Sequence, residues 1–551
     1  MSGNARGELA DWRRVRRYAV PRWMIEQAAE RRLAGDWAGA CAAARVRVAL
    51  DLPSIAREHG AEVAAAVEDD LRHLVPDLVR WHLPRYGHGR STAAVHNALV
   101  LAEHGGVPLH VLTPTMADGP QHLTLRFQPV RDGEESLTQE VDWTRLRHLW
   151  DVRHTAELLA RCGGTDRAPF FRPDGTPLAE AELGRTDDEP GRFERATLLL
   201  DRGEPEAAFE AAGLELDLTP PDVPSFYNAE PRAILSGLPL ALTRIVEEAR
   251  RIGGDRFQVS STWRCVTLFE FGDRPRARVV ETNKAKGAVP LPQSVWRRPP
   301  DLDLLRTGAL GPDDLHPLVR SALFPAYPDP GRPAGPPAEP AAPEPVRVRC
   351  KGGEWHEVVV RDGDLRIPHT DEEREREQAL EALGGKVTGC FAVHTAWRTS
   401  TGRLPRRLRE QRQELFLHLQ HGDTPAVLRL LNAGAAVRSL DGRKRTLLHH
   451  LHLVDHEELL PRLLKAGLDL EARDQGGRTP LHMAVGDHGS PELVRALVDA
   501  GARLDVVDDM EFGLIDLIRR WKRTDLAWLK DRLEAEHPDV GGGYWSYDED
   551  Y

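Results

Sequence analysis

The segment Gly476–Asp508 reads GGRTPLHMAVGDHGSPELVRALVDAGARLDVVD and contains two short apolar stretches, each with a glycine close behind it. Similar ladders of leucine pairs recur upstream, and the glycines that follow them are Gly434, Gly467 and Gly501, at spacings of 33 and 34 residues. A fixed period of this size is typical of a solenoid, in which each unit buries its apolar face only against its neighbours. The pattern predicts a stack of helix pairs over residues 408–536.

The segment resembles an ankyrin repeat along most of its length. The run Thr479-Pro480-Leu481-His482 matches the turn and first helix of that family, and one residue is inserted between the two helices. The positions that match the second helix and the following finger are Leu493, Val494, Leu497, Gly501 and Asp508.

Three further repeats lie in the same frame. In Arg445–Gly467, Thr446, Leu448, His449 and His456 fall on motif positions, although Leu447 replaces the proline and Asp455 the usual glycine between the helices. Residues 414–441 resemble an N-terminal cap and residues 511–533 a degenerate C-terminal cap. Four units exceed the minimum of about three that a stable stack requires.

The ankyrin resemblance implies protein binding through finger tips and the concave helix face, with no common active site. The residues that correspond to this surface, and that we expect to contact a protein partner, are Arg443, Lys444, Arg445, His450, Arg478 and Met483. The cationic finger residues favour an acidic partner, because complementary charge steers association.

The histidine-rich run of the second repeat has an alternative interpretation as a metal site, since zinc binds three or four His, Cys or carboxylate groups. His452 and His456 have helical spacing, but that spacing spans the predicted turn between two helices. His449 and His456 are already explained by the repeat. We therefore expect no metal and no cofactor here, and His450 is the better candidate for partner contact.

A proline-rich stretch at 326–345 predicts an extended linker, because proline can neither pair in a sheet nor continue a helix. A small β-β-β-α-β domain is expected at 346–398, with Thr370 and Glu373 as a capping box and Lys386–Trp397 as the last strand. The acidic, aromatic tail at 537–551 is expected to be disordered, with docking into a partner groove or the cationic fingers as an alternative.

The region before the linker is expected to hold two related α+β modules, at 10–165 and 185–325. Leu33–Leu50 aligns with Leu200–Leu218, and Asn97–Pro114 with Arg264–Glu281, at an offset near 167 residues in both cases. The second pair predicts β-hairpins. Two unrelated helix-and-hairpin stretches are the alternative.

Bulk properties restrict the function classes. The chain has 551 residues and a formal net charge of -12, which disfavours nucleic acid as the main partner. Five scattered cysteines indicate reduced thiols, and the absence of long apolar runs predicts a cytoplasmic protein without membrane spans. Arginine-rich, lysine-poor composition is typical of GC-rich bacterial genomes.

Catalytic signatures are missing from the sequence: there is no GxxxxGK[ST], GxSxG or HExxH motif. Asp69 and His73 have helical spacing for an acid/base pair but are more simply a surface ion pair. A nucleophile built from Cys390 with His356 or His369 requires side chains that nothing in the sequence brings together.

The sequence thus predicts a multidomain α+β protein with two tandem related modules, a small β-rich domain and a C-terminal ankyrin solenoid. The favoured function is an adaptor or regulatory scaffold that binds a protein. An enzyme or effector whose N-terminal body is targeted by the ankyrin arm is the alternative; a pocket with convergent polar groups at the junction of the two modules would favour it. The oligomeric state is not predicted.

Overall fold

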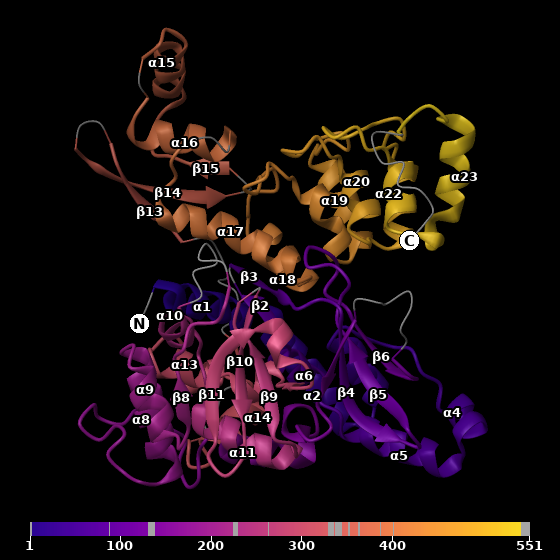
Figure 1. Ribbon diagram of the computed structural model, residues 1–551. Helices are drawn as coiled ribbons and strands as arrows, with labels where there is room; N and C mark the ends of the chain where they lie inside the picture. Colours follow the sequence, from indigo (N-terminus) through magenta and orange to yellow (C-terminus); the bar gives the residue numbers. More distant parts are fainter. Residues whose placement is uncertain are drawn as a thin grey trace. The chain divides into compact units, whose positions relative to one another are not determined.

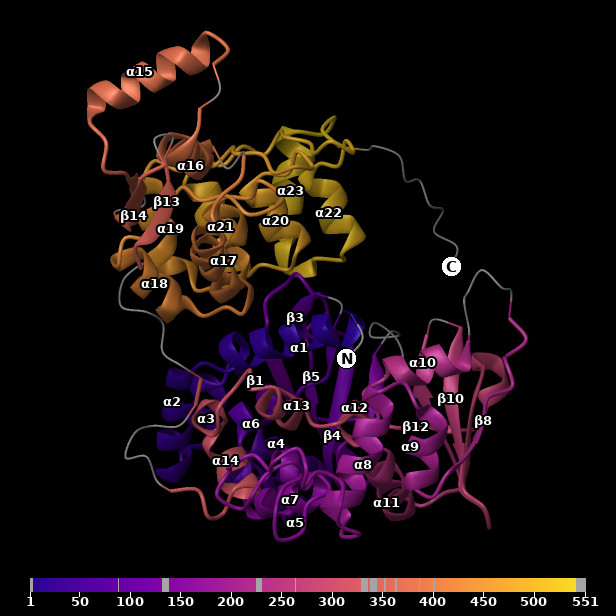
Figure 2. The ribbon, with the colours of Figure 1, turned by 90° about the vertical axis from the view of Figure 1, so that its left-hand side faces the viewer.

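The structure is a computed structural model that describes residues 3–87, 89–130, 138–223, 230–262, 264–328, 335–336, 344–350, 353–361, 364–385, 387–399 and 402–541. The chain divides into two compact units (Figures 1 and 2). One comprises Met1–Pro114 and His122–Pro337, and the other Thr115–Gln121 and Ala338–Tyr551. Most of the predicted linker and the tail 542–551 lie outside the described residues.

The N-terminal unit contains two five-stranded mixed sheets. The first has the order β1-β6-β5-β4-β7 and the second β12-β9-β10-β11-β8. The strands of the first sheet are β1 (Val46–Val48), β4 (Asn97–His104), β5 (Val107–Leu112), β6 (Leu123–Phe127) and β7 (Gln139–Asp142). Those of the second are β8 (Glu215–Asp217), β9 (Arg256–Ser260), β10 (Cys265–Glu270), β11 (Arg276–Glu281) and β12 (Val289–Pro290).

Both sheets have the same connectivity around an antiparallel meander of three strands. The strand before the meander pairs in parallel with its last strand, as β1 does with β6 and β8 with β11. The strand after the meander pairs in parallel with its first strand, as β7 does with β4 and β12 with β9. A short hairpin of β2 (Arg85–Gly87) and β3 (Arg90–Ala93) precedes the first meander.

Both predicted hairpins form, but they occupy different places in their sheets. The hairpin at Asn97–Pro114 is β4–β5, the first of its meander, whereas that at Arg264–Glu281 is β10–β11, the second of its meander. The two segments are therefore not topological equivalents, and the alignment of these hairpins was wrong. Both have the same alternating pattern and turn, so sequence alone did not distinguish neighbouring hairpins.

Helices surround the two sheets, and one continuous apolar core runs through the N-terminal unit. The helices are α1 (Gly3–Arg14), α2 (Arg22–Leu33), α3 (Trp37–Ala43), α4 (Leu52–His59), α5 (Ala61–His73), α6 (Pro76–His82), α7 (Leu158–Arg161), α8 (Glu189–Asp201), α9 (Pro205–Ala211), α10 (Pro231–Gly237), α11 (Leu242–Ile252), α12 (Gln293–Trp296), α13 (Pro300–Arg306) and α14 (Pro317–Leu323). A π-helix, η1 (Val15–Ala19), continues α1.

The C-terminal unit begins with the three-stranded sheet β13-β14-β15, formed by Val346–Arg349, Trp355–Arg361 and Asp364–Arg366. The capping box is present before α15 (Asp371–Ala382), where Thr370 N–H donates to Glu373 and Glu373 N–H donates to Thr370 Oγ1. In both views α15 projects away from the sheet (Figures 1 and 2).

The last element of this region is a helix, α16 (Gly389–Thr399), so the predicted strand at Lys386–Trp397 was wrong. Cys390, Val393, Ala396 and Trp397 are all buried, and their spacing of three or four residues matches one face of a helix. They pack with the buried valines of β13 and β14.

Four helix pairs follow in chain order. They are α17 (Arg406–Gln420) with α18 (Thr424–Asn432), the 3₁₀ helix η7 (Leu447–Leu453) with α19 (His456–Lys465), α20 (Pro480–Gly486) with α21 (Pro491–Asp499), and α22 (Leu514–Arg520) with α23 (Ala527–Glu536). The first helices form an inner row, since α17 contacts η7, η7 contacts α20, and α20 contacts α22.

The glycines that reveal the period have a shared structural role. Gly434, Gly467 and Gly501 follow the second helix of successive repeats and have φ values of 92°, 76° and 98°. This left-handed conformation ends a helix, and its energetic cost is lowest for glycine because glycine has no Cβ. Across the described residues, no helix combines the length and apolar character that crossing a membrane requires.

Candidate functional site

The fingers between repeats are held by one aspartate each, at the repeat spacing. Asp441 accepts hydrogen bonds from the backbone N–H groups of residues 443 and 445, at 2.8 and 2.9 Å. Asp474 accepts the equivalent hydrogen bonds from the N–H groups of residues 476 and 478, and Asp508 accepts them from those of residues 510 and 512. A carboxylate that accepts two backbone N–H groups fixes a tight turn, so these residues set the shape of each finger.

Histidines of the repeat motif link one repeat to the next. Thr446 N–H donates to His449 Nδ1 at 3.1 Å, so Nε2 carries the ring proton and donates to the Arg478 carbonyl at 3.0 Å. Burial lowers the pKa of His449 to about 4, which keeps the ring neutral at physiological pH. His449 is therefore structural, as the repeat interpretation predicts.

A groove of about 670 Å³ lies along the face that α17 shares with the first finger. Its apolar lining is supplied by Leu404, Phe416, Leu417, Leu440 and Leu453. The charged side chains around it are four arginines and two aspartates: Arg409, Arg412, Arg443, Arg445, Asp118 and Asp441. The groove thus combines an apolar floor with a mainly cationic border.

The structure places five of the six predicted contact residues in three different environments. Arg443 and Lys444 are exposed on the first finger, and Arg443 borders the groove. Arg478 is half-buried and donates to Asp474 at 2.9 Å. Arg445 and His450 also line the groove, although both are largely buried.

Met483 was assigned wrongly, because its side chain is 1% exposed and lies inside the repeat array. The motif position after the histidine turns inward in this repeat, so this methionine offers no surface to a partner.

The two histidines that the repeat motif does not explain are both beside the groove. His450 packs against the Phe416 ring, with a centroid distance of 5.3 Å, and its Nε2 lies 3.3 Å from Asp441 Oδ2. His452 contacts the carbonyl oxygens of His449 and Asp118. Of the four histidines in this run, these two are the ones placed at the candidate binding surface.

The N-terminal unit contains a separate small cavity of about 60 Å³. Its border includes a buried ion pair: Arg16 Nε donates to Asp301 Oδ1 at 2.5 Å, and the Arg16 guanidinium stacks on Trp81 at 4.4 Å. Trp81 Nε1 also donates to Asp301 at 3.0 Å. Arg16 and Asp301 are therefore mutually satisfied and form one wall of the cavity.

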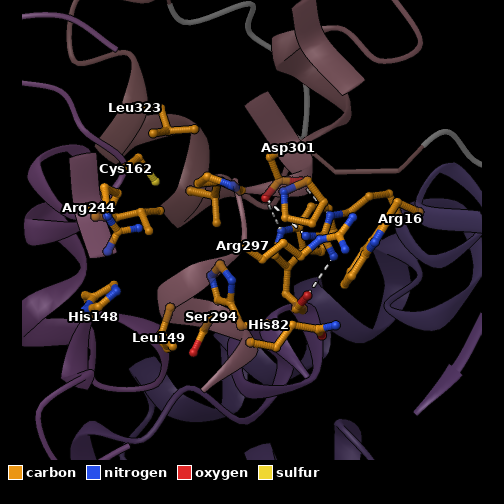
Figure 3. Close-up of a pocket in the computed structure, with 17 residues that line it drawn as sticks. Arg16, His82, His148, Leu149, Cys162, Arg244, Ser294, Arg297, Asp301 and Leu323 are labelled. Atoms are coloured by element: carbon orange, nitrogen blue, oxygen red, sulfur yellow. Dashed lines mark hydrogen bonds and ion pairs between the residues drawn. The ribbon is translucent and has the colours of Figure 1, made fainter. Parts of the chain in front are cut away.

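Several other polar atoms around this cavity are buried without hydrogen-bond partners in the part of the chain that the structure describes. They are His82 Nε2, His148 Nδ1, Arg244 Nε and Nη2, Ser294 Oγ and Arg297 Nε. Figure 3 shows Arg244, His148 and Ser294 around the cavity, across from Arg16 and Asp301. Buried polar groups are normally paired, so this concentration of unpaired donors indicates a place for a ligand or for water.

Arg297 pairs with Glu8, so Arg244 is the guanidinium of this set without a close ion pair among the described residues. Its nearest carboxylate is Glu248, at 3.6 Å from Nη2, but Glu248 already accepts from Arg161 and Arg251 at 2.5 to 2.7 Å. Burial lowers the pKa values of Arg244 and His148. An anion in the cavity would compensate the buried guanidinium.

Sequence reasoning missed this cavity entirely. Its residues come from separate elements spread between α1 and α14, so sequence spacing does not bring them together. Asp69 and His73, by contrast, form the surface pair that their spacing predicts, 3.5 Å apart on α5.

Comparisons with known proteins agree with the repeat geometry. A family model described as ankyrin repeats in three copies matches residues 415–508. The mouse protein named protein phosphatase 1 regulatory subunit 27 is 34% identical over 106 residues, which cover 19% of this chain and 68% of that protein. Its human counterpart is 33% identical over 106 residues.

Human transient receptor potential cation channel subfamily A member 1 is 37% identical over 81 residues, 15% of this chain and 7% of the channel. Ankyrin repeats imply protein–protein interaction. The repeat period, the helix pairs that end at glycine and the similarity to these proteins together show that this chain belongs to the ankyrin-repeat family.

Proposed function

We propose that the protein is an intracellular adaptor or regulatory scaffold that binds a protein partner in the groove between α17 and the first finger. The observation that carries this proposal is the groove itself, an apolar lining bordered by arginines on the inner face of a repeat array. Interfaces combine an apolar centre with a polar border in the same way.

The composition of the groove selects the kind of partner. Arg445 is already paired with Asp474, but the exposed Arg409 and Arg443 remain at the border, so a peptide that brings carboxylates there gains complementary charge. Phe416 is half-buried and has its ring against His450, which leaves an aromatic anchor for an apolar side chain of the partner. We therefore propose an acidic segment with at least one large apolar residue.

The relatives support the class of function but do not supply the partner. The name of the mouse and human relatives describes a regulatory subunit of protein phosphatase 1, a protein that works by assembling with another protein. The similarity is confined to about a fifth of this chain, and what it supports is partner binding by the repeats.

A binding experiment with matched variants tests the proposal. Full-length protein, Phe416→Ala and Arg443→Glu would be used to capture partners from a native lysate, with Arg519→Glu on the last repeat as control. Arg519 is 61% exposed and pairs with Glu534 at the surface, so its reversal costs about 1 kcal/mol or less. We expect both groove variants to capture at least tenfold less partner than the wild type, and the control to capture as much as the wild type. Equal capture by all four proteins would refute the groove as the binding site.

A second candidate function is a small-molecule or effector activity of the N-terminal unit. The specific observation is the cavity lined by Arg244, His148 and Ser294, each with a buried polar atom that has no hydrogen-bond partner among the described residues. We propose that it binds a small anion such as a carboxylate or phosphate. Its walls come from both halves of the unit, as the enzyme alternative requires.

Thermal unfolding in increasing inorganic phosphate or acetate tests the anion site. A ligand that binds only the folded state raises the unfolding temperature with its concentration. We expect this rise in the wild type and in Arg250→Met, an exposed neighbour on α11, but not in Arg244→Met. An equal rise in all three proteins would show that the effect comes from salt and not from the cavity.

We also infer that the two halves of the N-terminal unit are copies of one module. Two observations support this inference. The two sheets have the same connectivity, and a helix pair leads into the first strand of each, α2–α3 into β1 and α8–α9 into β8. Gly35 and Gly203, which lie in the aligned segments Leu33–Leu50 and Leu200–Leu218, both have φ of 79° in the turns between these helices. A sequence profile built from each half separately would test this inference by detecting the other half.

A further inference from the structure

Two cysteines and two histidines converge in the small domain before the repeats. The side-chain ligand atoms of Cys350, His356, His369 and Cys390 all lie within 4.8 Å of one another. His356 Nδ1 is 3.1 Å from His369 Nε2, Cys350 Sγ is 3.5 Å from His369 Nε2, and Cys390 Sγ is 3.7 Å from His356 Nδ1. The cluster belongs neither to the groove nor to the N-terminal cavity.

Each ligand comes from a different element, and the backbone is shaped to bring them together. Cys350 lies in the turn after β13, His356 in β14, His369 just before α15, and Cys390 in the first turn of α16. Gly389 has φ of 65°, and a Cβ there would lie 2.9 Å from Cys350 Sγ. Only glycine allows the start of α16 to approach the first cysteine so closely.

The backbone also prepares one sulfur to carry negative charge. Cys390 N–H, at the N-terminus of α16, lies 3.4 Å from Cys350 Sγ and donates to it. Backbone donors at a helix N-terminus stabilise anions, including thiolates.

The outer nitrogens of both histidines face carboxylates. His356 Nε2 lies 3.5 Å from Glu354, and His369 Nδ1 lies 3.4 Å from Glu373. In neutral rings these outer nitrogens then carry the protons, so the lone pairs of both inner nitrogens point at each other and at the sulfurs. Such convergence is unfavourable without a cation, and carboxylates behind ligating histidines are the usual outer partners of a metal site.

From this geometry we propose that Cys350, His356, His369 and Cys390 bind one zinc ion in a closed tetrahedral site. With Zn–S of about 2.3 Å and Zn–N of about 2.0 Å, a tetrahedron has S···N edges of about 3.5 Å and an N···N edge of about 3.3 Å. The S···N distances of 3.5 and 3.7 Å and the N···N distance of 3.1 Å are close to these edges. Two thiolates and two neutral imidazoles also give the site a charge that balances Zn²⁺.

The role of this zinc is structural, because all four coordination positions are filled by side chains. The domain has three short strands, and its apolar core is small, so a metal supplies stability that burial alone does not. The site joins the sheet to α16, whose Trp397 carbonyl accepts from Arg412 of α17 at 2.5 Å. The ion therefore holds α16 in place, and α16 in turn contacts α17, the first helix of the repeat array.

Metal analysis of the full-length protein tests the site directly. We expect about one zinc per chain after expression in zinc-supplemented medium, and a loss of at least tenfold in Cys350→Ser and in His369→Asn. Two controls should retain the ion: Cys41→Ser, a buried cysteine in the other unit, and His394→Asn, a buried histidine of α16 that lies toward Asp364.

A second measurement on the wild type alone covers the case in which the variants fail to fold. Full-length protein stripped with a chelator is titrated with Co²⁺, and we expect the absorption of tetrahedral thiolate coordination to saturate at one equivalent. Zinc should protect Cys350 and Cys390 from alkylation. The proposal is overturned if the wild type holds less than one tenth of an equivalent of zinc and shows no such cobalt spectrum. A Cys350–Cys390 disulfide in the purified protein, or full zinc content in both site variants, would also overturn it.

Discussion

Replacing Asp474 by alanine removes the residue that fixes the second finger of the repeat array. Its Oδ1 accepts from the N–H groups of Gly476 and Arg478 at 2.8 and 3.0 Å, and its Oδ2 faces Arg445 Nε at 3.4 Å. Hydrogen bonds to a charged acceptor contribute about 1.5–3 kcal/mol each. Arg445 is only 6% exposed, so it is also left as a buried charge without this carboxylate.

The expected loss is about 3–5 kcal/mol in the stability of the finger and its neighbouring repeats. The contact with Arg478 adds little, because that side chain is 31% exposed and water replaces it. Asp508→Ala, which removes the same two backbone hydrogen bonds from a half-buried aspartate, should cost less than Asp474→Ala.

Hydrogen exchange in the full-length protein measures this local stability. Because about 1.4 kcal/mol corresponds to a tenfold change, amides in peptides that cover residues 474–486 should exchange about 100-fold faster or more in Asp474→Ala. Asp505→Ala, which breaks only an exposed pair with Arg503, should leave those amides within about threefold of the wild type. Exchange in Asp474→Ala that equals this control would refute the role of the aspartate in the finger.

Three further predictions concern other parts of the fold. Burial lowers the folded-state pKa of His449 to about 4, below its ordinary value of 6.5. The contribution of the neutral ring to the free energy of unfolding is therefore full above pH 6.5 and falls by up to about 3 kcal/mol as the pH drops toward 4. Urea midpoints measured against pH should fall less steeply in acid for His449→Asn than for the wild type, and an unchanged slope would contradict this. Gly467→Ala, at φ of 76°, should cost about 1 kcal/mol by denaturant unfolding, whereas Gly442→Ala, which has open space around it, should cost less than half as much. Asp301→Asn should destabilise the N-terminal unit by about 3–5 kcal/mol, because it leaves the buried Arg16 without its carboxylate partner. Denaturant unfolding measures this loss, and a value under about 1 kcal/mol would contradict the reasoning.

The parts of the fold that sequence predicted are those with local signals. The ankyrin period was visible because the first three repeats each end their second helix at a left-handed glycine and bury the same leucine face. Its second repeat was recognised despite Leu447 in place of proline, although its first helix is 3₁₀ and not α. The strand predicted at Lys386–Trp397 failed because a short apolar run satisfies both helix and strand patterns.

The sites depend on contacts that sequence spacing does not reveal. Cys350 and Cys390 are 40 positions apart, and Arg16 and Asp301 are 285 apart. The zinc ligands have no paired CxxC spacing because each comes from a separate element, and we therefore expected no metal from the sequence. Burial separated Met483 from Arg443, two residues that the repeat motif alone places on the same surface.

Site-specific photo-crosslinking from the groove tests the central claim, that this face of the repeats binds a protein, most directly. A photoreactive side chain would replace Gln413, which is exposed and lines the groove, and in a second protein Arg519 on the last repeat. Binding in the groove predicts a discrete protein adduct from position 413 that disappears when Arg443→Glu is added, and no such adduct from position 519. No adduct from position 413, or the same adducts from both positions, would contradict it.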